Sequence, residues 1–167
     1  RTGGVSAVEY DATSYLLGTR YLTTRDTTFI FEYYRNGTGF TPEEMKNFFG
    51  FVNDAYQGYA ATANDTALQK AATLFEGNYG RLNPMRDYLY LRIAQKEPFD
   101  ILYFNPAITT IFNLNDRSLT VAPEMVYTRI KNLDLRLKAS FITGPRDSEC
   151  GEKPFDFRLE LRAGFYF

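Results

Sequence analysis

Charged side chains alternate with apolar ones in the C-terminal part of this sequence. A strand points successive side chains to opposite faces, so such alternation gathers the charged residues on one face. Arginines and carboxylates of mixed sign on one surface form salt bridges or set an electric field for passing solutes. The residues in question are Arg136, Lys138, Asp156, Arg158, Glu160 and Arg162.

Residues suited to catalysis are few. The sequence has no histidine and a single cysteine, Cys150, which removes the usual general base of hydrolases and an ordinary zinc site. Asp156 and Glu160 would stand about 13 Å apart on a strand, too far for a glycosidase pair. Glu9 and Asp11 would stand about 7 Å apart, within the inverting range, but acids near a strand end are usually solvated. We therefore expect no enzyme activity and no cofactor.

The last thirteen residues, 155–167, carry the clearest strand pattern. Every second position is apolar, and the positions between are mostly charged, so one face is wholly apolar and the other polar. The apolar positions are Phe155, Phe157, Leu159, Leu161, Ala163, Phe165 and Phe167.

Six further segments show strand periodicity, and a helical region interrupts them. Thr41, Pro42 and Glu44 form a helix start with a capping box, and an apolar stripe follows to about Tyr56. A second helix is expected from residue 65 or 66 to 76, ended by Gly77. The predicted strands are 5–22, 28–35, 86–94, 102–114, 119–130, 133–141 and 155–167, with a helical insertion at 37–83.

These elements predict an all-β, antiparallel, up-and-down sheet of about seven strands. Alternation does not say which face is inside. A soluble lipocalin-like barrel or a sandwich turns the apolar face inward, whereas a membrane barrel turns it toward lipid. Pro106 and Pro123 each lie within a predicted strand and would require a bulge or a break in pairing.

The terminal strand resembles the C-terminal signal strand of Gram-negative outer-membrane β-barrel proteins, over Leu159 to Phe167. The resemblance implies a transmembrane barrel in the outer membrane, contact with its lipid, and recognition by the assembly machinery. It also implies that the assembly signal consists of Leu161, Gly164, Phe165 and Phe167.

The connections between strands favour the same reading. If the C-terminus is periplasmic, the connections on that side, 23–26, 95–100 and 131–132, are all short. Both long connections, 37–83 and 144–153, then lie on the outer side, which is the membrane-barrel pattern. Most predicted strands also reach the roughly 9–11 residues that a tilted strand needs to cross a bilayer.

Seven strands are an odd number, whereas bacterial barrels have an even number. Because the sequence starts at Arg1 without a Met, we interpret residues 1–167 as the C-terminal part of a larger barrel. The remaining strands would come from a missing segment or another chain, and Cys150 is an incidental thiol or pairs with that segment. A net charge of −1 gives no basic field for nucleic acid.

The function that this fold suggests is a porin-like channel for small solutes. The alternatives are a structural scaffold that sheaths a partner, such as the porin component of an electron-transfer complex, and a soluble carrier. The helical insertion would constrict or cap the outer mouth, or form a self-packed surface subdomain. The predicted lumen-lining residues are Arg20, Glu32, Arg92, Glu124, Arg136, Lys138, Asp156, Arg158, Glu160 and Arg162.

Overall fold

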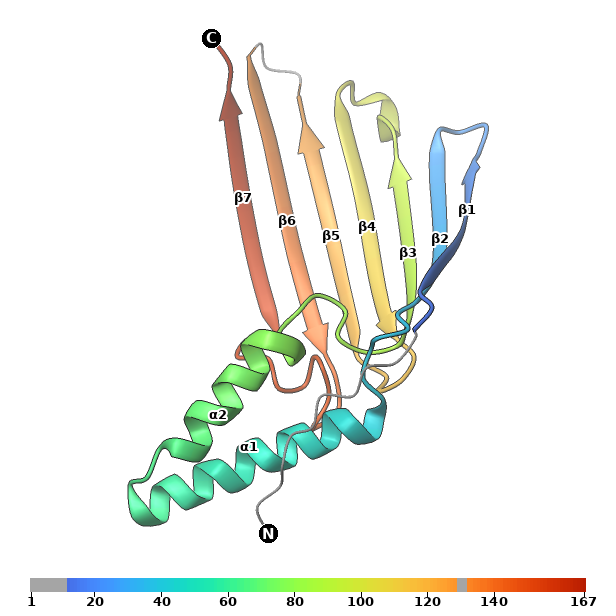
Figure 1. The fold of residues 1–167 in the computed structure, drawn as a ribbon. Coiled ribbons are helices and arrows are strands. Elements are labelled where there is room, and N and C mark those ends of the chain that lie inside the picture. Colours follow the sequence, from blue (N-terminus) through green and yellow to red (C-terminus); the bar gives the residue numbers. More distant parts are fainter. Residues whose placement is uncertain (1–11, 129–131) are drawn as a thin grey trace.

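The computed structural model describes residues 12–128 and 132–167 and contains one seven-stranded antiparallel sheet (Figure 1). The strands lie side by side in chain order, so the topology is up-and-down. Within the described residues nothing pairs with the outer edges of β1 and β7, and the sheet is open. The strands are β1 (Tyr15–Leu22), β2 (Thr27–Arg35), β3 (Asp87–Gln95), β4 (Phe104–Asn113), β5 (Leu119–Tyr127), β6 (Leu133–Thr143) and β7 (Phe157–Phe165).

The number, order and direction of the predicted strands are confirmed, but their boundaries are not. The last strand spans Phe157–Phe165 rather than 155–167, and others also differ by more than a residue or in part lie outside the described residues. Residues 12–14 are not in a strand, so the first strand begins at Tyr15; the predicted part at 5–11 lies outside the described residues. The fourth begins at Phe104 because Tyr103 has φ = 64°, which no strand residue adopts. The fifth ends at Tyr127, with 129–130 outside the described residues.

The two prolines interrupt pairing without shifting the register. On β4, pairing with β3 stops at Ala107, so Pro106 pairs only with β5. On β5, the β6 ladder is interrupted between Val121 and Glu124, the stretch that contains Pro123. A break in hydrogen bonding is the expected result, because proline has no N–H to donate to a ladder.

The insertion between β2 and β3 contains α1 (Pro42–Thr62), α2 (Thr66–Leu74) and a π-helical turn, η1 (Phe75–Tyr79). The predicted capping box is confirmed: the backbone N–H of Glu44 donates to the Thr41 hydroxyl at 3.2 Å, and its carboxylate accepts from the Thr41 N–H at 2.8 Å. A short 3₁₀ turn, η2 (Pro98–Asp100), lies between β3 and β4.

Both predicted helix ends were wrong. α1 continues past Tyr56 and stops at Ala63, whose φ of 55° is left-handed. Gly77 does not end the second helix, because it lies inside η1 and no described glycine has positive φ. The residue that ends α1 in the left-handed conformation is therefore an alanine, whereas sequence propensity favours glycine at this position.

The sheet has two unlike ends, which we call the turn end and the loop end. The short connections 23–26 and 96–103 lie at the turn end, together with the end of β5, the start of β6 and the C-terminus. The insertion and the connections 114–118 and 144–156 lie at the loop end, where α1 and α2 extend beyond the strands (Figure 1).

Candidate functional site: the polar face and the loop end

The strand register divides the sheet into two chemically distinct faces. Residues directly opposite each other in an antiparallel pair point to the same face, so each pairing extends a face by one strand. We call the face that carries Glu124 and Glu160 the polar face. Nine predicted lumen residues share it: Arg20, Glu32, Arg92, Glu124, Arg136, Lys138, Arg158, Glu160 and Arg162. The tenth, Asp156, precedes β7, and its backbone carbonyl accepts from the N–H of Ile142 at the loop end.

Two carboxylates organise the charges on the polar face. Glu124 on β5 lies between Arg92 of β3, at 3.0 Å, and Arg136 of β6, at 3.7 Å. Its side chain is 12% exposed, so both arginines converge on a largely covered group. Glu160 on β7 lies between Arg158, at 3.4 Å, and Arg162, at 3.8 Å, and is more open. Arg20, Glu32 and Lys138 share the face but form no ion pair with any described residue.

The opposite surface, the apolar face, is uncovered although it is made almost entirely of hydrophobic side chains. Leu17 is 64% exposed, Leu159 60% and Leu161 73%. Aliphatic residues occupy most of its middle, where Phe31 of β2 also lies, and the other aromatic residues lie near the strand ends. The aromatics at the turn end are Tyr21, Phe29, Phe104, Tyr127 and Phe165, and those at the loop end are Tyr15, Tyr33, Phe112, Phe141 and Phe157.

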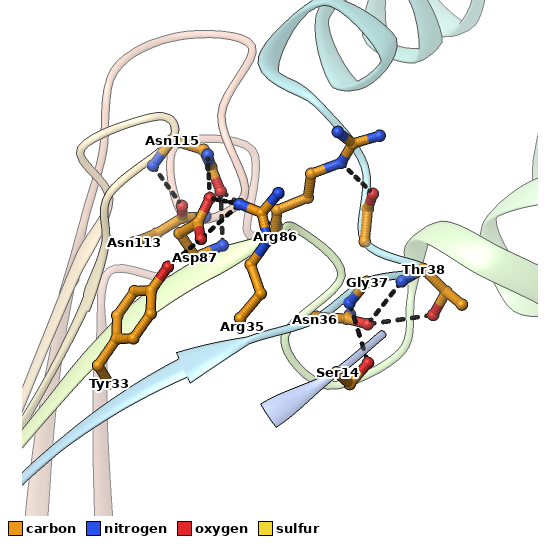
Figure 2. Close-up of polar contacts among 11 residues, drawn as sticks. Ser14, Tyr33, Arg35, Asn36, Gly37, Thr38, Arg86, Asp87, Asn113 and Asn115 are labelled. Carbon is orange, nitrogen blue, oxygen red and sulfur yellow. Dashed lines mark hydrogen bonds and ion pairs between the residues drawn. The ribbon is translucent and has the colours of Figure 1, made fainter. Parts of the chain in front are cut away.

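A polar cluster lies on the apolar face at its loop-end margin (Figure 2). Nη1 of Arg35 donates to both carboxylate oxygens of Asp87 at 2.6 Å, and the Tyr33 hydroxyl donates to the same carboxylate at 2.6 Å. Asn115 donates to Asp87 at 3.2 Å and accepts from the backbone N–H groups of Arg86 and Asp87. The cluster fixes the last residues of β2 to the first of β3, where the insertion begins and ends.

Sequence reasoning missed this cluster, although it left a signal. Charged residues stood on otherwise apolar strand faces at Arg35 and Asp87, each at a strand end. Hydrogen bonds also fix the turn that follows β2. Within the turn, Asn36 accepts from the N–H and hydroxyl of Thr38, and the Gly37 N–H donates to Ser14, which precedes β1 (Figure 2).

The helical insertion packs on the polar side of the sheet. Its buried cluster consists of Met45 of α1, Met85 and Tyr88, and Tyr34 and Ile111 pack against this cluster. Tyr34, Tyr88 and Ile111 all point to the polar face. Gly39 allows this close approach, because a Cβ there would lie 2.2 Å from the carbonyl oxygen of Met85.

The connection 144–156 folds onto the same side. Oε2 of Glu149 accepts from the Tyr88 hydroxyl at 2.7 Å and from Nδ2 of Asn113 at 2.8 Å. The N–H of Cys150 donates to the Ser118 hydroxyl at 3.2 Å. Burial raises the pKa of the Glu149 carboxyl above its usual range, although both hydrogen bonds act in the opposite direction.

Between the insertion and this connection lies an open groove of about 620 Å³. It is lined by four largely apolar residues, Phe49, Val52, Tyr56 and Leu68, and by four polar ones, Asn53, Arg146, Asp147 and Glu152. Among the described residues no group of histidine, cysteine and acidic side chains is arranged to hold a metal ion. None of the helices in the described part of the chain is both long and apolar enough to cross a membrane.

Comparisons with protein-family models, with curated proteins and with solved structures gave no match to this chain.

Proposed function

We propose that this chain is part of a transmembrane β-barrel of a Gram-negative outer membrane and that its polar face lines a porin-like channel for small solutes. The observation that carries the proposal is the apolar face, which crosses all seven strands and is exposed. Contiguous exposed apolar patches on soluble proteins rarely exceed a few hundred Å². A lipid bilayer is the solvent that suits a larger one.

The spacing of the aromatic residues supports this environment. Phe157 and Phe165 begin and end β7, which has 9 residues. At about 3.4 Å per residue they stand roughly 27 Å apart along the strand, or about 20 Å along a membrane normal at a tilt near 40°. Outer-membrane barrels carry an apolar band about 25 Å tall between two aromatic girdles, which is close to this height.

The polar face supports the channel reading. In a barrel whose apolar face meets lipid, the ion pairs of Glu124 and Glu160 lie in a hydrated interior. Arginines and carboxylates around a pore set its preference for anions or cations. The predicted assembly signal also fits, since Leu161 and Phe165 point to the apolar face and Gly164 to the polar face; Phe167 follows the strand.

Further strands are needed to close the barrel, because backbone groups at an open edge cannot face lipid. β1 and β7 run in the same direction (Figure 1). Direct closure, or a ring of identical copies, would therefore join them in parallel. Closure that keeps every pair antiparallel requires an odd number of additional strands, supplied by another segment or chain.

The test is conductance of the complete protein in planar lipid bilayers. We expect stable channel events, and replacement of Arg136, Arg158 and Arg162 by Gln should shift the reversal potential toward cation preference. Reversal potentials that do not change would show that these arginines do not line a pore. Absence of channel events from folded, membrane-inserted protein would rule out the channel.

A structural scaffold is the second candidate, and one observation favours it. The insertion and the connection 144–156 both pack on the polar side of the sheet, where they would narrow or plug a lumen. A scaffold would insert into bilayers without conductance and would retain a partner protein on purification. A soluble carrier is disfavoured, because it requires a dry apolar interior; such a protein would remain in the aqueous phase during detergent extraction.

A further inference from the structure

Glu149, in the connection 144–156, is linked through its side chain and its backbone to residues that hold the other two connections at the loop end. Tyr88, which donates to Glu149, also accepts from the backbone N–H of Met85 at 2.8 Å and so holds the end of the helical insertion. Asn113, the second donor, is the last residue of β4 and is 2% exposed. The N–H of Glu149 itself donates to Oδ2 of Asp116, in the connection 114–118, at 2.7 Å.

The surroundings of this carboxylate favour its neutral form. No Arg or Lys of the described residues forms an ion pair with Glu149. Lys153 on the same connection attracts the ionised form, and Asp116 repels it. The titratable neighbours Tyr88 and Cys150 are uncharged at neutral pH, since burial raises the pKa of each above its already alkaline usual value. Both donors bond to Oε2, and Oε1 has no hydrogen-bond partner among the described residues, so it can carry a proton.

We propose that the connection 144–156 is a proton-controlled latch: it stays docked on the polar side of the sheet when Glu149 is protonated and loosens when Glu149 is ionised. The proposal describes only the docking of the connection 144–156, so it does not depend on whether the polar face lines a channel. If that face lines a channel, the latch lies at its outer mouth and narrows it at acidic pH.

The direction of the pH effect follows from linkage. In the docked state burial holds the pKa of Glu149 above its usual value, and in the undocked state the carboxyl returns to that value. Docking is therefore strongest below the ordinary carboxyl pKa. It weakens as the pH rises through the raised pKa of the docked form, by up to about tenfold for each pH unit between the two values.

Amide hydrogen exchange of the complete protein in detergent micelles, between pH 4 and 8, tests the latch. Protection factors for the N–H groups of Glu149 and Cys150 correct for the intrinsic pH dependence of exchange. We expect these factors to fall as the pH rises. Glu149→Gln keeps an oxygen acceptor for Tyr88 and removes the titration, so its profile should be flat. A flat wild-type profile, or a Gln variant that keeps the slope, would overturn the proposal.

Two variants on the surface keep the test decisive if Glu149→Gln does not fold. Glu152→Gln, on the same connection, removes a carboxylate that among the described residues accepts only from the Asp147 N–H, and it should leave the pH midpoint unchanged. Lys153→Gln removes the cation that lowers the pKa of Glu149, so the midpoint should move to higher pH. A shift with Glu152→Gln, or none with Lys153→Gln, counts against the latch.

Discussion

The two faces of this sheet are built by the same strands, yet the protein treats them in opposite ways. On the polar face, carboxylates are paired with arginines, and the helical insertion packs against one end. On the apolar face, leucines and aromatics are exposed, and none of the described helices covers them. A water-soluble sheet normally places its helices over the apolar face. The reversed arrangement is what the proposed lipid-facing orientation of the apolar face would require.

The largest expected effect comes from a charge on the apolar face. Leu137 lies mid-strand on β6, opposite Met125 and Leu161. If this face meets lipid, Leu137→Arg should lower the free energy of unfolding by about 2–4 kcal/mol, the usual penalty for arginine near the bilayer midplane. The measurement is urea-induced unfolding from lipid vesicles.

Ser140→Arg is the matched control, since it lies on the same strand but on the polar face, opposite Arg158. Hydration and a like-charge neighbour should limit its effect to within about 1 kcal/mol. Equal effects of the two substitutions would mean that the two faces meet the same solvent and would remove the basis of the membrane proposal.

A smaller effect is expected when the charge of a covered carboxylate is removed, and Asp87 and Glu160 allow a covered and an exposed carboxylate to be compared on the two faces. Asp87 accepts from Tyr33, Arg35 and Asn115 at the margin of the apolar face and is largely covered. Asp87→Asn removes the charge that these donors share, so the unfolding free energy should fall by about 1–3 kcal/mol. Local exchange at the start of the insertion should rise as well.

Glu160→Gln provides the comparison on the polar face. Its partners Arg158 and Arg162 are both well exposed, at 63% and 69% of the side chain. Exposed ion pairs contribute about 1 kcal/mol or less, so stability should change little. If Glu160→Gln lowered the unfolding free energy more than Asp87→Asn, Glu160 would be the covered carboxylate and Asp87 the hydrated one, contrary to the structure.

Alternation carried enough information to predict both faces. The seven strands and the shared face of nine charged residues follow from a period of two, which is a local property. Alternation does not predict which of the charged side chains form ion pairs with one another. The pairing of Arg92 with Glu124 joins β3 to β5 across β4, and it depends on register and rotamer. Glu149 lies in a polar connection with no periodicity, so its role appears only once the loop end is folded.

The last prediction concerns ion selectivity, and it tests directly whether the polar face lines the conducting path. Glu124→Gln removes the carboxylate that Arg92 and Arg136 share, which leaves two cationic groups unpaired on the polar face. In bilayer recordings under a salt gradient, the reversal potential should move toward anion preference. Lys138→Gln removes a cationic group from the residue opposite Glu124, so its shift should have the opposite sign. Shifts of opposite sign require both side chains to face the conducting path, whereas two unchanged potentials would place the polar face outside it.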